Sequence, residues 1–471
     1  MAMSADLAYR SATELIALYR ARRASPVEVT RACLARIEAL NPKLNAFCIV
    51  DAEGALRAAG ESEARWMRGA PQGSLDGIPV SIKDLLLTSG WPTLRGSRTV
   101  DANQAWDQDA PAVARLREHH AILLGKTTTP EFGWKAVTDS PLTGITRNPW
   151  NPAKTPGGSS GGAAVAVATG MGALAVGTDG GGSIRIPASF TGIFGLKPSF
   201  GRVPAWPLSL FGTVSHVGPM TRTVEDAALM LDVISEPDVR DWFALPHDDR
   251  DYRDGLDDGI AGLHIAFAPT LAGADVDAEI AGIVERAVEA FGELGAHIVE
   301  AAPDLGDVAD VERTHWWAGA TRVVQSMAPE RRAVADPGLL RIAEKGHAFT
   351  LADYLEAVEA RGALGAALRQ FHARHSILLT PTLPIQAFDA GRLAPPQHGD
   401  VDGDWTVWAP FSYPFNLTQQ PAASVPCGFT REGMPVGLQI VGPMHDDRLV
   451  LRVARAFEKA RPWQGSYARL A

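Results

Sequence analysis

Residues 157–202 read GGSSGGAAVAVATGMGALAVGTDGGGSIRIPASFTGIFGLKPSFGR and decide what the rest of the chain is built around. Glycine falls in two clusters, at 157–162 and 180–182; Ser159 and Ser160 lie within the first and Ser183 directly follows the second. An apolar run of small residues joins them, which predicts a turn, a packed helix, a buried strand and a second turn. Glycine lets backbone approach a ligand closely, and successive N–H groups in such a turn can point at one oxygen. This arrangement suits acyl transfer beside a nucleophilic serine.

Composition excludes several classes of protein. The chain has 471 residues, 46% of them hydrophobic, with a formal net charge of -10, and it contains no block of Lys or Arg. An acidic chain of this kind is a poor nucleic-acid binder. No apolar run reaches the 18 residues of a membrane span, and the first residues lack the pattern of a signal peptide. We therefore expect a cytoplasmic protein that binds neither nucleic acid nor membrane.

Three widely spaced cysteines, Cys33, Cys48 and Cys427, predict reduced thiols rather than a disulfide framework. The same spacing offers no zinc site, and the glycine-rich core contains no cluster of metal-ligand type. We expect no metal and no organic cofactor.

Strands and helices alternate along the chain, which predicts an α/β fold with a central mixed, twisted sheet covered by helices on both faces. Helices over about 1–70 form an N-terminal layer, about 75–235 form the core, and the remainder completes the sheet and the pocket. Residues 1–471 are expected to form a single domain. The segment 384–405 is rich in Pro, Gly and Asp and predicts a surface loop.

The glycine clusters fit other motifs poorly. Neither is followed by the lysine of a phosphate-binding P-loop, and the dinucleotide pattern G-x-G-x-x-G is absent. Gly158, Ser160 and Gly162 do satisfy G-x-S-x-G, the nucleophile elbow of Ser-His-Asp hydrolases. That alternative needs a downstream histidine, and the sequence singles out none among His216, His247 and His264.

The motifs around this core resemble those of the amidase signature enzymes. The resemblance spans nearly the whole chain: GIPVSIKD at 77–84, EFGW at 131–134, TRNPWNP at 146–152, the quoted core, GPMTRTVEDAALMLDV at 218–233 and PVGLQIVGPMHDDRLVLRVARAFE at 435–458. It implies the amidase-signature fold and a hydrolase that cleaves the C–N bond of amides, aryl amides or carbamates (urethanes) through a covalent acyl-enzyme.

Carried over residue by residue, the resemblance implies a Ser–cis-Ser–Lys triad. Ser183 matches the nucleophile, Ser159 the bridging serine after a cis Gly158–Ser159 peptide, and Lys83 the base. Lysine accepts a proton only when neutral, which burial favours. The amides of Gly180, Gly181, Gly182 and Ser183 match the oxyanion hole.

Other residues near this core have less specific interpretations. Gly133 matches a substrate-contacting position. Its aromatic neighbours Phe132 and Trp134 are candidates for the pocket, and packing in the core is an equal alternative for them. Read alone, Lys83 also fits a surface ion pair with Asp84. Asp179 and Arg185 favour a structural ion pair, and we expect Ser160 to hydrogen-bond locally.

The alternative within the family is the A-type component of a tRNA-dependent amidotransferase that uses glutamine. That component carries an aspartate seven residues before the asparagine of a late N-L-A-G segment. Here the segment is N-L-T-Q from Asn416, and seven residues earlier stands Ala409. A free-standing hydrolase of small amides or carbamates is the better fit, and a homodimer is left open.

Overall fold

The structure is a computed structural model that describes residues 7–399 and 401–470. Its main sheet has eleven strands in the order β1-β3-β2-β6-β8-β7-β12-β13-β11-β9-β10, and β4 and β5 form a separate small hairpin. The strands are β1 Phe47–Val50, β2 Pro79–Lys83, β3 Ile122–Thr127, β4 Asp139–Ser140, β5 Gly144–Ile145, β6 Leu174–Asp179, β7 Phe194–Lys197, β8 His216–Thr221, β9 His264–Phe267, β10 His297–Glu300, β11 Ile377–Pro381, β12 Ala422–Phe429 and β13 Pro435–Val441.

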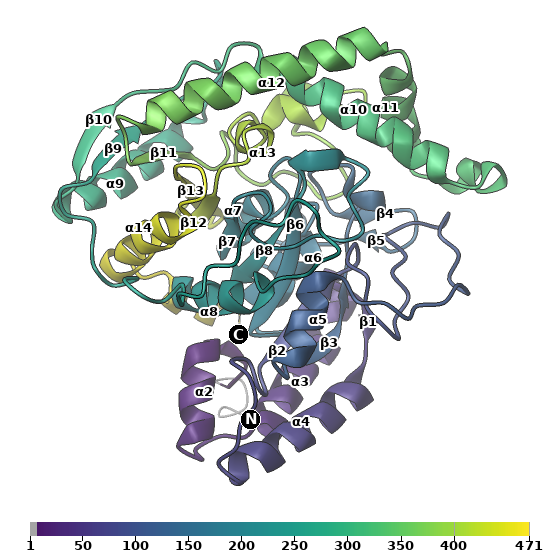
Figure 1. The fold of residues 1–471 in the computed structure, drawn as a ribbon, viewed down its shortest axis with the longest axis vertical. Helices are drawn as coiled ribbons and strands as arrows, with labels where there is room; N and C mark the ends of the chain where they lie inside the picture. Colours follow the sequence, from purple (N-terminus) through teal and green to yellow (C-terminus); the bar gives the residue numbers. More distant parts are fainter. Residues whose placement is uncertain (1–6, 400, 471) are drawn as a thin grey trace.

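Helices flank this sheet, as Figure 1 shows. They are α2 Ala12–Arg20, α3 Pro26–Leu44, α4 Ala52–Met67, α5 Pro111–Glu118, α6 Gly161–Ala168, α7 Arg185–Thr191, α8 Val224–Ile234, α9 Ala278–Glu293, α10 Val308–Ser326, α11 Pro337–His347, α12 Leu351–His372, α13 Pro414–Leu417 and α14 Asp447–Ala460. The helices α6 and α7 touch each other and the central strands, whereas α8, α14 and α9 form a second connected layer. The predicted α/β fold with a helix-covered sheet is confirmed.

The sheet is mixed. Strand β2 runs parallel to both β3 and β6, whereas β8 and β12 pair antiparallel with their neighbours. The adjacent parallel strands β3, β2 and β6 bring their carboxyl ends to one edge, the usual position of a ligand site in open α/β sheets. Those ends carry Lys83, Thr127 and Asp179.

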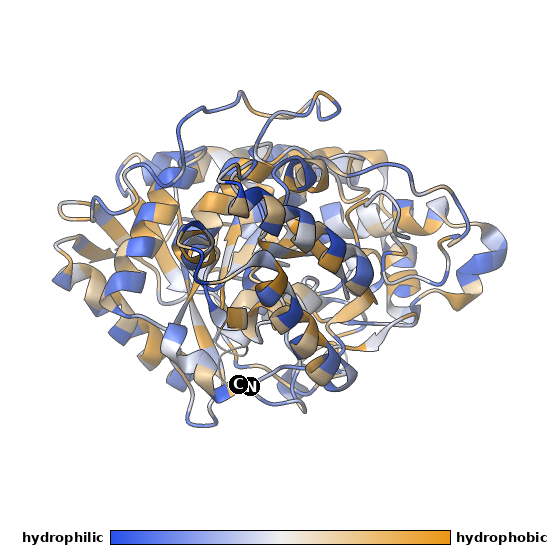
Figure 2. Ribbon diagram, turned by 90° about the horizontal axis from the view of Figure 1, so that it is seen from below, coloured by the Kyte–Doolittle hydropathy of each residue, from blue (hydrophilic) through white to orange (hydrophobic). Residues whose placement is uncertain are grey.

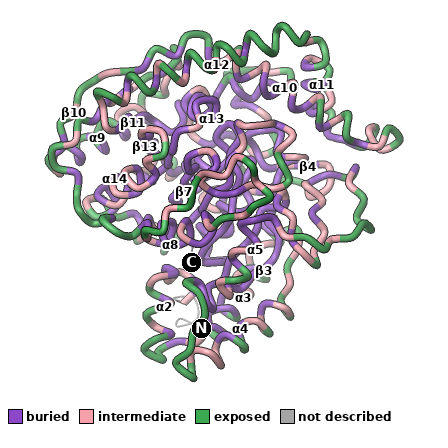
Figure 3. The backbone as a smooth tube through the Cα atoms, viewed as in Figure 1, coloured by how far each residue is buried: buried purple, intermediate pink, exposed green. Residues whose placement is uncertain are grey.

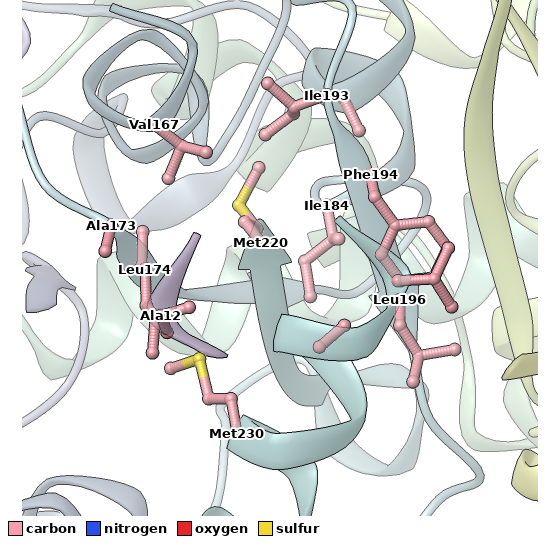
Figure 4. Close-up of a cluster of buried hydrophobic side chains, with 14 of the residues drawn as sticks. Ala12, Val167, Ala173, Leu174, Ile184, Ile193, Phe194, Leu196, Met220 and Met230 are labelled. Atoms are coloured by element: carbon pink, nitrogen blue, oxygen red, sulfur yellow. The ribbon is translucent and has the colours of Figure 1, made fainter. Parts of the chain in front are cut away.

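The glycine-rich core folds as predicted into turn, helix, strand and turn. Every residue of α6 is buried, because its small side chains fit between the sheet and the neighbouring helix. Figure 4 shows Val167 of α6 with Leu174 at the start of β6, near Ile184, Phe194 and Met220. In Figure 3 the buried residues gather along these central strands, and the exposed ones lie mainly on the outer helices.

The outer helices are mostly exposed and bury only one side. The long helix α12 buries only Ala357, Leu364, Leu368 and Phe371. Figure 2 shows many of the helices striped, with hydrophilic and hydrophobic residues on different sides. No helix within residues 7–399 and 401–470 combines the length and apolar character that a membrane crossing requires.

Candidate active site

Lys83 ends β2 and points into the core. Every residue of this strand is buried, and Lys83 itself is 0% exposed. Its Nζ lies 2.6 Å from Ser159 Oγ, 2.8 Å from Ser160 Oγ and 2.9 Å from Thr178 Oγ1. Burial lowers the pKa of Lys83 well below its ordinary value, and the nearby charge of Asp179 only partly opposes this effect. The lysine is therefore a candidate neutral amine among hydroxyl groups.

The turn that carries Ser159 and Ser160 is tightly packed. The Gly158–Ser159 peptide is cis, as expected. A Cβ atom at position 158 would lie 2.5 Å from the carbonyl carbon of Val137, so only glycine fits there. Ser160 Oγ donates to the carbonyl of Thr178 at 3.0 Å and accepts from its N–H at 3.2 Å. The prediction that Ser160 hydrogen-bonds locally is confirmed.

Ser183 follows the second glycine cluster, between β6 and α7. Its carbonyl accepts the N–H of Ser160 at 3.1 Å, which joins the two turns. Its hydroxyl makes no hydrogen bond to any other residue of the described parts of the chain. The geometry thus brings Lys83, Ser159 and Ser183 into one site.

The amides of the second turn fall into two groups. Gly182 has a φ of +126°, a conformation open to glycine, and its N–H donates to Asp179 Oδ1 at 2.6 Å. This amide is occupied, which departs from the predicted set of four oxyanion donors. The N–H groups of Gly180, Gly181 and Ser183 have no acceptor among the described residues.

The predicted ion pair of Asp179 and Arg185 is confirmed, and it anchors this turn. Arg185 Nη2 lies 3.0 Å from Asp179 Oδ1, and both side chains are fully buried. Arg185 also donates to the carbonyl of Ser412 and to Gln439 Oε1, each at 2.8 Å. Burial alone would raise the pKa of Asp179, but the guanidinium of Arg185 outweighs it and holds that pKa below its usual value. The turn is thus braced by a charged network.

Two of the three predicted pocket residues lie at the site. A Cβ atom at Gly133 would lie 3.3 Å from Ser159 Oγ, so a side chain here would crowd the hydroxyl of Ser159. Phe132 lines a cavity of about 130 Å³ that reaches the site at Thr178. Most of its other walls are apolar or aromatic: Leu85, Leu86, Phe200, Val203, Pro204, Trp206, Leu210, Phe211, Val217, Phe243 and Val323.

Trp134 does not line this cavity. It is 1% exposed, and its ring packs on α11, where a Cβ atom at Gly338 would lie 2.6 Å from it. Its carbonyl accepts the indole N–H of Trp316 at 2.8 Å. Its position is that of a core residue that holds the pocket segment in place.

Two alternative interpretations are wrong. Asp84 does not pair with Lys83 at the surface; its buried carboxylate lies 3.5 Å from Nζ of Lys126 on β3. Ser160 is not the serine of an elbow with a histidine base, because its hydroxyl is bonded to Lys83 and Thr178. His216 bonds through Nδ1 to the carbonyl of Val214, and His247 and His264 are exposed.

Two residues at this site carried no signal in the sequence. Thr178 is an ordinary strand residue until the fold places its hydroxyl on Lys83. Glu312 lies on α10, distant in sequence from every motif, yet its carboxyl group faces Gly181. Within the described ranges, no three His, Cys, Asp or Glu residues gather as a metal site would require.

Comparison with known proteins finds relatives over nearly the whole chain. The family model Amidase matches residues 28–451. An acylamidase of Rhodococcus erythropolis is 38% identical over 469 residues, 97% of each chain. The A-type component of the glutamyl-tRNA(Gln) amidotransferase of Myxococcus xanthus is 35% identical over 477 residues, 95% of this chain and 96% of that protein.

Among solved structures, a bacterial aryl acylamidase of the amidase signature family is similar over 98% of both chains, with a TM-score of 0.90 and 32% identity. The predicted amidase-signature fold is thereby confirmed. Sequence, fold and the match over most of the chain agree, and the chain belongs to the amidase signature family, whose members are amide-hydrolysing enzymes.

Proposed function

We propose that this protein is a free-standing hydrolase of aryl or other apolar amides and carbamates that works through a Ser183–Ser159–Lys83 triad. One observation carries the proposal: a fully buried lysine, with its pKa lowered by burial, lies 2.6 Å from the hydroxyl of Ser159. A neutral amine in hydrogen-bond contact with a serine is the arrangement of a general base.

The hydrogen bonds around Lys83 support one direction of proton transfer. A neutral amine donates two hydrogen bonds and accepts one. The hydroxyl proton of Ser160 is directed to the carbonyl of Thr178, so Ser160 accepts from Lys83. Thr178 Oγ1 is the second acceptor, at 2.9 Å. The lone pair of Lys83 is then left for the hydroxyl of Ser159, which donates to it.

In the proposed reaction Ser159 relays a proton. Its O–H proton passes to Lys83 as it takes the proton of Ser183, whose Oγ attacks the carbonyl carbon of the substrate. The tetrahedral oxyanion accepts hydrogen bonds from the amides of Gly180, Gly181 and Ser183. Each such donor stabilises the transition state by about 3–4 kcal/mol by precedent. The proton then returns from Lys83 through Ser159 to the leaving nitrogen, and the C–N bond breaks. Water, activated by the same pair, hydrolyses the acyl-enzyme and restores Ser183.

The cavity supports the proposed class of substrate. Phe132 and Thr178 line it, Thr178 also contacts Lys83 through its hydroxyl, and the walls are largely apolar and aromatic. Contact with such walls favours substrate binding by about 25 cal/mol for each Å² of apolar surface removed from water. The similarity to an acylamidase and to an aryl acylamidase favours the same class.

The test is a substrate panel with the purified chain alone: an anilide, a primary amide, an aryl carbamate, an ester and glutamine. We expect the anilide and the carbamate to turn over, and a slow substrate to add the mass of its acyl group to the wild type. Ser183→Ala should carry no such adduct. An adduct on Ser183→Ala, or turnover of glutamine alone, would contradict the proposal.

The alternative function is that of one component of a glutamine-using amidotransferase, favoured by the similarity to such proteins. Ala409, where the resemblance expects an aspartate, is fully buried and offers no carboxylate for the amine of glutamine. Turnover that appears only with partner proteins and tRNA would support this alternative.

A further inference from the structure

Helix α10 covers the proposed oxyanion turn with two residues one helical turn apart. A Cβ atom at Gly180 would lie 3.0 Å from the ring of Trp316, and one at Gly181 would lie 3.2 Å from Glu312 Oε1. Residues four apart share a helix face, so both side chains press on the turn from the same side. The carboxyl group of Glu312 is therefore a neighbour of the amides proposed to receive the oxyanion.

Glu312 has no partner for its charge. It is 0% exposed, and neither carboxyl oxygen accepts a hydrogen bond from the described residues. The cation with the largest electrostatic effect on Glu312 is Arg361 of α12. Its guanidinium already donates to the carbonyl of Leu417 at 2.6 Å and to Thr213 Oγ1 at 2.9 Å. An ionised carboxylate without donors is costly in a buried site.

The charged groups around Glu312 do not offset the cost of ionising its carboxyl group. From the core, Asp179 disfavours its charge and Arg185 favours it, but these two already neutralise each other. Asp404 disfavours it from the segment before Trp405, and the hydroxyl of Tyr413 is also close enough to interact. Burial is the largest effect and raises the pKa of Glu312 well above its ordinary value. Burial without hydrogen-bond donors therefore favours the protonated form of this carboxyl group.

We propose that Glu312 is a positioning residue of the oxyanion turn, and that it works in its uncharged form. Its side chain fills the space behind Gly181 and keeps the turn in place, while its proton keeps negative charge away from the oxyanion that forms on the other side. In a buried site such a charge would act at close range and slow the reaction. This inference rests on the proposed function, since it presupposes that the amides of Gly180 and Gly181 hold the oxyanion.

Kinetics of two variants test the proposal. Glu312→Gln keeps the size and the neutrality of the side chain, and should retain kcat within about threefold of the wild type. Glu312→Ala leaves the turn unsupported, and should lower kcat about tenfold to a hundredfold while KM changes less than about threefold, by analogy with lost oxyanion donors. Thermal melting shows whether each variant is folded.

Infrared spectroscopy tests the protonation state directly. The infrared difference spectrum, wild type minus Glu312→Gln at neutral pH, should contain the C=O band of a protonated carboxylic acid. Glu458→Gln is the matched control. Glu458 is also buried and has a raised pKa, but it lies on α14 and accepts a hydrogen bond from Arg455. This variant should keep wild-type kinetics.

The outcomes separate this proposal from the proposed function. Carboxylate bands in the difference spectrum, a loss of kcat in Glu312→Gln equal to that in Glu312→Ala, or full activity of Glu312→Ala would each overturn the role of Glu312. If an acyl group still forms on Ser183 in such a case, the triad stands and only this inference fails. If no acyl group forms on Ser183 at all, the proposed function fails first.

Discussion

Lys83 is the residue whose protonation should govern the rate. Burial lowers its pKa, so the neutral form is populated at lower pH than for an exposed lysine. The rate should rise with pH through that pKa and then level off, because only the neutral amine accepts the proton relayed by Ser159. Lys83→Ala should lose about three orders of magnitude in kcat. Lys83→Arg should fail as well, since guanidinium stays protonated.

The measurement is the pair of pH–rate profiles of wild type and Lys83→Ala on an activated ester. The basic limb should disappear in the variant. If both proteins show the same limb with similar amplitude, another group is the base.

Ser160 should prove supportive rather than essential. Its hydroxyl accepts from Lys83 and bonds to Thr178, and it is not in the proposed proton path. Ser160→Ala removes one of the two acceptors that orient the amine, so we expect kcat to fall about tenfold, whereas Ser183→Ala should abolish acyl-enzyme formation. Stopped turnover in Ser160→Ala together with an acyl adduct on Ser183→Ala would reverse the assignment of the two serines.

At this scale the sequence predicted the residues that belong to continuous motifs. Lys83, Ser159 and Ser183 each stand in a distinctive stretch, and the structure places all three at one site. Thr178 and Glu312 could not be predicted, because their importance lies in contacts between segments far apart in the chain. The aromatic residue Trp134 is a candidate both for the pocket and for core packing in the sequence, and the structure decides for packing, because neighbouring residues in an irregular segment point in different directions.

Among the elements at the site, the turn at 180–183 leaves little room for a larger side chain. A Cβ atom at Gly181 would lie 2.5 Å from the ring of Trp405 as well as close to Glu312. Gly181→Ala must push the turn away from both, which displaces a proposed oxyanion donor. We expect at least a hundredfold loss in kcat with the fold retained, measured by steady-state kinetics and circular dichroism.

Gly362→Ala is the control for that substitution. Gly362 lies within α12, and no atom stands within 4 Å of the position its Cβ would take. Alanine should stabilise this helix by about 1 kcal/mol and leave kcat as it is. Equal activity losses in the two variants would mean that the crowding at Gly181 has no special role.

Elements with strong local signals were predictable. A capping box of Ser25 and Glu28 begins α3, and one of Thr350 and Asp353 begins α12. The strands β7 and β8 carry no such signal, because short buried strands within a glycine-rich stretch show no alternating pattern. The helix α11 is ambiguous in the sequence: Asp336 caps it and Pro337 begins it, but Pro-Gly also signals a turn.

For the whole molecule, the contribution of Asp232 to stability should fall as pH rises from about 4 to 8. Asp232, at the end of α8, has its pKa raised to about 8, first by burial and then by a hydrogen bond with Asp251. The folded state therefore keeps a proton that the unfolded chain has already lost in this interval, and stability decreases until pH passes the folded pKa. Below the unfolded pKa the full contribution is present.

Asp232→Asn should flatten this dependence. Its amide oxygen still accepts the N–H of Tyr252, which lies 2.6 Å from Asp232 Oδ1 in the wild type, and its NH₂ group replaces the shared proton. Melting temperatures from about pH 5 to 8.5, an interval that brackets the loss of this proton, should decline less in the variant than in the wild type. Parallel curves would show that this carboxyl pair does not share a proton in the folded state.

Arg185 has a consequence for the order in which the enzyme becomes active during its synthesis. The groups that hold its guanidinium from the other side, the carbonyl of Ser412 and the amide of Gln439, lie 227 and 254 residues further along the chain. A ribosome therefore releases the proposed nucleophile, Ser183, long before the partners that fix its loop exist. On the proposed mechanism a nascent chain carries Ser183 in an unfinished site, and we expect hydrolysis only once β13 has joined the sheet.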